Sequence, residues 1–107
     1  MGDYIDACAL ADVPEGELKG IRIGGVPVVI GNVDGQLAAI GGVCSHEDEL
    51  LEEGELDGHV VRCPLHDSGF DIHTGRAIRR PATRGVPVYD VRIEGSRVLV
   101  SREPRGQ

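Results

Sequence analysis

The chain has 107 residues, the size of one small domain, which leaves no room for a catalytic domain beside a cofactor-binding one. Its net charge of −7 argues against binding to nucleic acid or anionic lipid, and no apolar segment is long enough to span a bilayer. Three cysteines are few, and an odd number cannot all pair within one chain, so a secreted disulfide framework is not expected. We therefore expect a cytoplasmic protein with no membrane contact.

The first forty residues predict a meander of antiparallel strands. Sixteen glycines and many valines and isoleucines indicate short strands and tight turns. Strands are expected at residues 3–7, 18–23, 26–30 and 37–40. The dipeptide Asp34-Gly35 is a two-residue hairpin signal between the last two of these strands.

The alternation of apolar and polar residues breaks down after Gly41 and returns over residues 86–100. Between these regions lie two polar loops and an acidic run, in which Glu47–Glu53 could form a short helical turn. The last strand is expected to close the sheet that the first residues begin. The sequence thus predicts one all-β domain, residues 1–107, with an insert at approximately 41–80.

Two cysteines and two histidines of the predicted insert occur in paired spacings. The pairs are Cys44-Ser45-His46 and Cys63-Pro64-Leu65-His66, separated by sixteen residues. Thiolates and imidazoles bind soft and borderline metals, and glycine or proline near each pair lets the backbone approach a metal closely. A structural zinc site has the same composition, but zinc ligands usually come as Cys-Cys and His-His pairs. The spacing therefore favours a different metal centre.

This pattern resembles the Rieske family, whose C-x-H and C-x-x-H loops are separated by a stretch of about this length. The resemblance continues through Phe70-Asp71 and Thr74-Gly75 into residues 86–100, and it implies a Rieske fold with an antiparallel sandwich base. It also implies one [2Fe–2S] cluster. Its ligands would be the thiolates of Cys44 and Cys63 on the inner iron and the imidazoles of His46 and His66 on the outer iron.

The ligand set makes the cluster easier to reduce than an ordinary ferredoxin cluster. Two ferric ions, two sulfides and two thiolates leave the oxidised centre neutral, whereas four thiolates would leave it at −2. Rieske potentials accordingly lie at roughly −150 to +300 mV, against about −400 mV for plant-type ferredoxins.

Several positions depart from the respiratory branch of the family, whose two loops are joined by a disulfide. Glu49 and Leu65 stand where that branch has the bridging cysteines. Ser68 keeps the position of a hydroxyl that donates to a cluster sulfur, but Phe70 replaces a second donor, a tyrosine. Because a lost donor destabilises the reduced centre, we expect a low potential. Asp67 stands where related ferredoxins usually have glycine.

The resemblance implies a one-electron carrier that transforms no substrate itself. An NAD(P)H-dependent flavin ferredoxin reductase would reduce the cluster of the monomeric protein, and a terminal aromatic-ring-hydroxylating dioxygenase would accept the electron. The alternatives are a carrier for another oxygenase or for a nitrite-reductase-type complex, a structural zinc module, and a redox sensor. No DNA-binding element supports the sensor.

The charges are distributed unevenly along the chain. Residues 1–61 carry thirteen acidic and two basic side chains, whereas residues 62–107 carry five acidic and nine basic ones. The acidic run from Glu47 to Asp57 is either a solvated face or a surface that attracts a basic partner.

The remaining candidates have weaker signals. We expect Cys8 to be a small buried apolar residue, and His59 and His73 to be surface turn residues. Pro81 either forms a turn or belongs to a proline loop that covers the cluster in the family.

Overall fold

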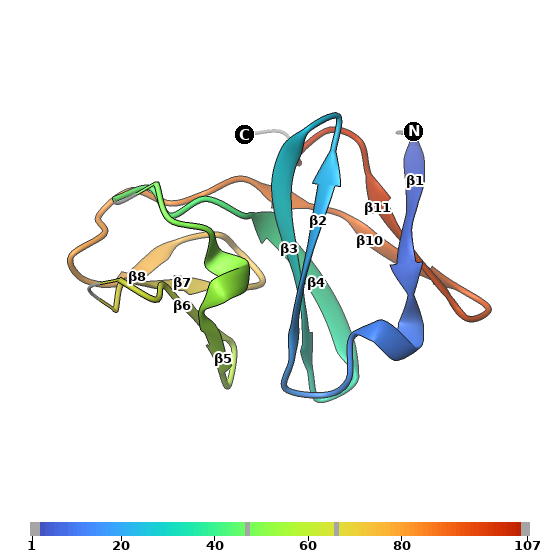
Figure 1. Ribbon diagram of the computed structural model, residues 1–107, viewed down its shortest axis with the longest axis horizontal. Coiled ribbons are helices and arrows are strands. Elements are labelled where there is room, and N and C mark those ends of the chain that lie inside the picture. Colours follow the sequence, from blue (N-terminus) through green and yellow to red (C-terminus); the bar gives the residue numbers. More distant parts are fainter. Residues whose placement is uncertain (1–2, 47, 66, 106–107) are drawn as a thin grey trace.

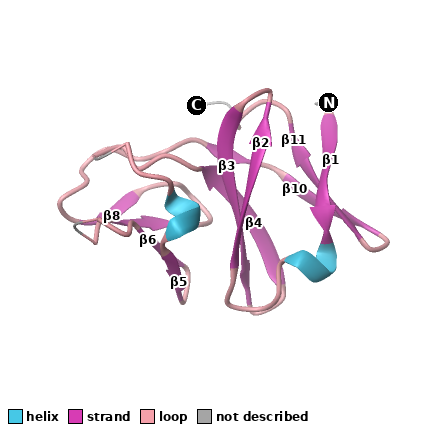
Figure 2. Ribbon diagram, viewed as in Figure 1, coloured by secondary structure: helices cyan, strands magenta, loops and turns pink. Residues whose placement is uncertain are grey.

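The computed structural model describes residues 3–46, 48–65 and 67–105 (Figure 1). In these ranges the strands form three antiparallel sheets, and the helical segments are two short 3-10 turns (Figure 2). This arrangement confirms the predicted all-β architecture.

Two of the sheets form the base and contain strands from both ends of the chain. The first has the order β1 (Tyr4–Ala9), β11 (Arg97–Ser101), β10 (Val91–Glu94). The second has the order β2 (Leu18–Ile23), β3 (Val26–Val33), β4 (Gln36–Gly41), β9 (Val88–Tyr89). A 3-10 turn, η1 (Leu10–Asp12), follows β1. The pairing of β1 with β11 confirms that the last strand joins the sheet begun by the first. The predicted meander, however, comprises only β2, β3 and β4, because β1 lies in a different sheet.

The third sheet is formed by residues that lie between β4 and β9 in the sequence, on the left of Figure 1. Its order is β5 (Glu55–Asp57), β6 (Val60–Arg62), β7 (Gly69–Asp71), β8 (Ala77–Arg79). A 3-10 turn, η2 (Leu51–Glu53), precedes it and is shorter than the predicted helical turn. The shortening follows from Leu50, which pairs with Val43 in an isolated bridge. Glu47, where that prediction began, lies outside the described residues.

Strand β3 is apolar at successive positions because both of its faces are buried. Val28 and Ile30 pack into the core between the two base sheets. Val29, on the opposite face, packs into a second core together with residues of the insert. The sheet β2-β3-β4-β9 is thus the middle layer that supports the third sheet.

The hairpin between β3 and β4 has the predicted two-residue loop. Asp34 and Gly35 have φ angles of 53° and 90°, as a type I′ turn requires, and Val33 pairs with Gln36. The side chain of Asn32 accepts a hydrogen bond from the Gly35 N–H at 2.8 Å, which fixes the turn.

The insert contacts the base through the shared core and at two further points. A methyl group on Gly31 of β3 would lie 3.2 Å from Cδ1 of Ile72, so this side chain packs directly on the strand backbone. Arg22 of β2 pairs with Glu52 of η2 at 2.9 Å. The insert is therefore held by the core that it shares with the middle sheet, by direct packing of Ile72 on β3 and by a partly exposed ion pair.

Candidate metal centre

The two predicted ligand loops close with the same backbone geometry. In the first, the Cys44 N–H donates to the Glu49 carbonyl at 2.8 Å. In the second, the Cys63 N–H donates to the Ser68 carbonyl at 2.7 Å. Each cysteine is therefore fixed at the start of a six-residue loop whose ends are held together.

Asp48 and Asp67 occupy equivalent positions in these loops, four residues after the cysteine, and both have left-handed backbones with φ of 58° and 62°. Glycine adopts this conformation most readily, and aspartate is among the few other residues that tolerate it. The backbone thus explains why aspartate can replace the glycine usual in related ferredoxins.

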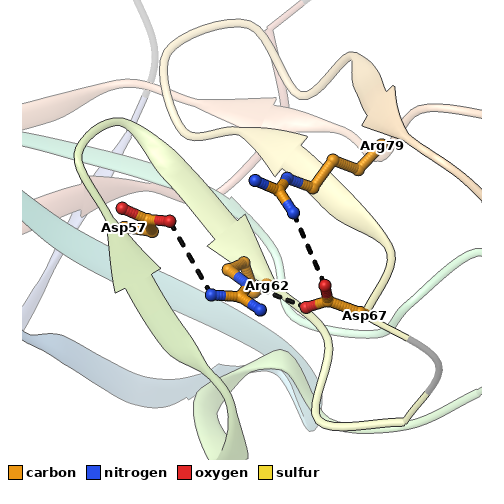
Figure 3. Close-up of polar contacts among 4 residues, drawn as sticks. All are labelled: Asp57, Arg62, Asp67 and Arg79. Carbon is orange, nitrogen blue, oxygen red and sulfur yellow. Dashed lines mark hydrogen bonds and ion pairs between the residues drawn. The ribbon is translucent and has the colours of Figure 1, made fainter.

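The side chain of Asp67 is held by two arginines (Figure 3). It accepts a hydrogen bond from Nε of Arg62 at 2.7 Å and lies 3.5 Å from Nη1 of Arg79. The hydrogen bond from Arg62 is the main reason that the pKa of the Asp67 carboxyl lies below its ordinary value, against a smaller opposing effect of desolvation. The two arginines therefore compensate the negative charge of Asp67. The sequence did not predict these ion pairs.

The thiols of Cys44 and Cys63 lie side by side in the core of the insert. Cys44 is fully buried and Cys63 is 3% exposed, among apolar residues that include Leu51 and Phe70. Burial raises the pKa of Cys63 to about 11, and the neighbouring Cys44 adds to this rise. Two adjacent thiolates in such a pocket require a cation. The pair therefore fits the iron of a [2Fe–2S] cluster that is bound by two thiolates.

His46 is exposed, beside the segment that contains Thr83 and Arg84. These residues and Ser45 line a surface hollow of about 300 Å³. The Ser45 hydroxyl donates to the Arg84 carbonyl and so ties the first loop to this segment. The structure thus brings together two of the predicted ligands and places the third near the surface. The fourth, His66, lies outside the described residues.

Over residues 3–46, 48–65 and 67–105, no three Cys, His, Asp or Glu side chains converge on a single metal ion. A Rieske cluster takes two protein ligands on each of its irons. Cys44 and Cys63 would supply the pair for one iron, whereas the pair predicted for the other iron includes His66, which lies outside the described residues.

Ser68 is fully buried behind the second loop. Its Oγ accepts a hydrogen bond from the Ala82 N–H at 3.0 Å, which leaves the hydroxyl hydrogen available for donation. The segment around Pro81, whose peptide bond is cis, is thereby fastened to the second loop. Phe70 is also buried and has no hydroxyl to donate. Donation from Ser68 to a cluster sulfur stays a prediction.

The weaker candidates lie where the sequence suggested. Cys8 is 6% exposed in the base core, which confirms its role as a small apolar residue. The rings of His59 and His73 stack at the surface, 6.4 Å apart between centroids. His59 also lies 3.5 Å from a carboxylate oxygen of Asp71.

Comparison with known sequences identifies the class of protein. The sequence model of the Rieske [2Fe–2S] domain matches residues 3–90. The chain therefore belongs to the Rieske [2Fe–2S] family, and its cofactor is a Rieske [2Fe–2S] cluster.

Individual relatives narrow the class to ferredoxins. The chain is 44% identical over 98 residues to the 3-phenylpropionate/cinnamic acid dioxygenase ferredoxin subunit of Shigella boydii, covering 90% of this chain and 91% of the relative. It is 36% identical over 101 residues to the ferredoxin component of the naphthalene 1,2-dioxygenase/salicylate 5-hydroxylase systems of a Ralstonia species, covering 94% and 97%. The protein is a Rieske ferredoxin, an electron carrier.

Solved structures support the same class. A chain in the complex of reduced oxygenase and oxidized ferredoxin of carbazole 1,9a-dioxygenase matches with a TM-score of 0.91 and 30% identity, covering 97% of both chains. The match confirms the predicted Rieske fold. Within the part of the chain that the structure describes, none of the helices has the length and apolar character needed to cross a bilayer.

Proposed function

We propose that this protein carries single electrons from an NAD(P)H-dependent flavin reductase to a terminal aromatic-ring-hydroxylating dioxygenase. The similarity to dioxygenase ferredoxins over nine-tenths of the chain is the observation that carries the proposal. The solved complex of an oxygenase with a ferredoxin supports an oxygenase as the electron acceptor. A chain the size of one domain suits a carrier that transfers electrons between two enzymes.

We propose Cys44 and Cys63 as the thiolate ligands and His46 and His66 as the imidazole ligands. The bound cluster would take up one electron and release it again. The chain's own contribution is to bury the thiols, to close both loops, and to leave His46 at the surface where a partner can approach.

The ligand assignment is tested on purified protein by iron and acid-labile sulfide analysis together with the visible absorption spectrum. We expect a coloured protein with two irons per chain. Cys44→Ser and Cys63→Ser should abolish the spectrum, whereas Cys8→Ser should retain it as the matched control. A Cys63→Ser variant with the unchanged spectrum would refute the assignment.

We further propose a potential at the low end of the Rieske range, because Phe70 cannot supply the second hydroxyl donor. A redox titration should give a negative midpoint potential. A clearly positive midpoint would contradict the proposal.

We propose that partners dock through charge. Asp48, Glu53 and Glu55 are exposed beside the first loop and η2. The hydrogen bond to Asp67 is the main reason that the pKa of the Arg62 guanidinium is raised, and Glu55 is near enough to contribute. Glu52 and Asp57 are instead paired with Arg22 and Arg62 inside the protein. The surface available to a basic partner is therefore smaller than the acidic run suggests.

The docking proposal is tested by electron transfer to the oxygenase of a phenylpropionate or naphthalene dioxygenase system. The double variant E53Q/E55Q should slow transfer at low ionic strength, and the difference should vanish at high salt because exposed charges are then screened. The matched control D3N/E94Q removes two exposed carboxylates of the base, one just before β1 and one at the end of β10. Equal effects of the two double variants at every ionic strength would refute the proposal.

The organisation of the chain is also proposed. Residues 1–107 would form a single Rieske domain with its cluster-binding insert at approximately 41–80. The three cysteines form no disulfide, which supports a cytoplasmic location of the protein. The exposed large apolar side chains lie on three different strands and in the second ligand loop, which supports a monomer; they are Val26, Leu65, Ile78 and Ile93.

A further inference from the structure

The second ligand loop has no covalent link to the first. Glu49 and Leu65 cannot form the disulfide that joins the loops in respiratory Rieske proteins, and the three cysteines of the chain are unbridged. The first loop is flanked by the Val43–Leu50 bridge and is tied by Ser45 to the segment at Arg84. The second loop projects between β6 and β7 and must be held by other contacts.

Asp67 provides such a contact from inside the second loop (Figure 3). Arg62 donates through Nε to one of its carboxylate oxygens at 2.7 Å, and Nη1 of Arg79 lies 3.5 Å from the other. Arg62 ends β6 and Arg79 ends β8. Asp57 at the end of β5 extends the network, 3.7 Å from Nη1 of Arg62. The loop is thus fastened to β6, which precedes it, and to β8, which lies next to β7 in the sheet.

Gly69 makes the contact with Arg79 possible. It pairs with Arg79 across β7 and β8, and a Cβ atom at Gly69 would lie 2.8–2.9 Å from the Cβ, Cγ and Cδ atoms of Arg79. The aliphatic part of Arg79 therefore lies over the bare backbone of β7, which directs its guanidinium toward Asp67. The packing of Arg79 on Gly69 is independent of the ion pairs and also supports a fixed position of Arg79 beside Asp67.

We propose that Asp67, held by Arg62 and Arg79, is a positioning residue that fixes the second ligand loop in place of a covalent link between the loops. The inference rests on the proposed ligands Cys63 and His66, which lie in this loop. Release of Asp67 frees the loop from β6 and β8. The cluster is then lost faster, although Asp67, Arg62 and Arg79 are not among the proposed ligands.

The test measures the rate at which the visible absorbance decays when the loaded protein is incubated with an iron chelator. Asp67→Asn and Arg62→Gln should each increase this rate by about three- to fivefold, the range of a few exposed ion pairs. The double variant should lose the cluster no faster than Asp67→Asn alone, because Asp67→Asn already removes the ion pair with Arg62. Asp67→Gly keeps the left-handed backbone and should also lose the cluster faster, since its carboxylate is missing.

Asp6→Asn is the matched control. Asp6 forms an ion pair of similar exposure with Arg97 in the base, at 2.8 Å, and its loss should leave the decay rate unchanged. Wild-type decay rates in Asp67→Asn and Arg62→Gln would overturn the proposal, as would an equal increase in Asp6→Asn.

The midpoint potential separates positioning from simple charge. Asp67→Asn removes a negative charge and Arg62→Gln removes a positive one, so an effect of charge alone shifts the potential in opposite directions and leaves both decay rates unchanged. That outcome would also overturn the proposal. If the wild-type protein itself showed no cluster spectrum, the ligand assignment would fail instead, and the two failures are therefore distinguishable.

Discussion

Gly54 lies at a position where a side chain would collide with the backbone. A Cβ atom there would overlap the carbonyl oxygen of Arg62 and lie 3.3 Å from Cδ of Pro64, next to the proposed ligand Cys63. Backbone atoms cannot move aside as the end of a flexible side chain can. The residue is therefore required by the second ligand loop, although it binds nothing itself.

Gly54→Ala should reduce the cluster content of purified protein and destabilise it by about 1–3 kcal/mol, because β6 must shift to relieve the overlap. The measurements are iron per chain and thermal unfolding. Gly58→Ala is the control: it has a φ of 63° but open space around it, so it should cost about 1 kcal/mol of strain and keep its cluster. Full loading of Gly54→Ala would contradict the prediction.

Ser68→Ala should lower the midpoint potential, since the reduced cluster would lose a hydrogen-bond donor. It should also destabilise the protein by about 1–3 kcal/mol, because the Ala82 N–H loses its buried acceptor. Redox titration and denaturant unfolding measure the two effects separately. Ser96→Ala, at an exposed serine in the β10–β11 turn, should change neither value. A lowered stability with an unchanged midpoint potential would mean that Ser68 accepts the hydrogen bond from Ala82 but donates none to the cluster.

Among the secondary-structure elements, the third sheet packs on the middle sheet through a shared core to which Ile72 contributes. This side chain is fully buried and packs on Gly31 of β3 and into the core shared with Val29. Because Gly31 has no side chain, Ile72 packs closer to the backbone of β3 than it could if any other residue type occupied position 31.

Ile72→Ala should destabilise the protein by about 2–5 kcal/mol, because it opens a cavity between the insert and the middle sheet. Ile93→Ala, at a residue that is 46% exposed on β10, should cost less than about 1 kcal/mol. Chemical unfolding of the two variants gives the comparison. Similar losses in both would mean that the insert does not depend on this contact.

Local signals made part of this architecture predictable from the sequence. Asp34-Gly35 specified a hairpin through its own backbone preferences, and the paired spacings of cysteine and histidine marked both loops. The contacts of Asp67 could not be predicted in this way. Arg79 reaches it only because β7 pairs with β8 opposite Gly69, and pairing across a sheet leaves no local pattern in the sequence. The helical turn was overestimated because the Val43–Leu50 bridge competes with it.

At the scale of the whole molecule, the two cores differ in their dependence on the cluster. Cys44 and Cys63 belong to the core of the insert, whereas the core between the base sheets contains neither of them. The base should therefore be stable without the cofactor, and the insert should not.

Removal of the cluster with acid and chelator, followed by return to neutral pH, should increase amide hydrogen exchange in β5–β8 far more than in β2–β4. Mass spectrometry of peptic fragments measures the two regions in one experiment. Rapid exchange throughout the chain would show that the base also requires the cofactor.

The position of the β10–β11 turn has a practical consequence. This turn lies at the opposite end of the molecule from the insert (Figure 1), and its residue Ser96 is exposed. Cys8 is buried and would not compete for a thiol-directed reagent. A Ser96→Cys variant could therefore be attached covalently to an electrode or a bead in one defined orientation, with the iron–sulfur end turned toward the solution.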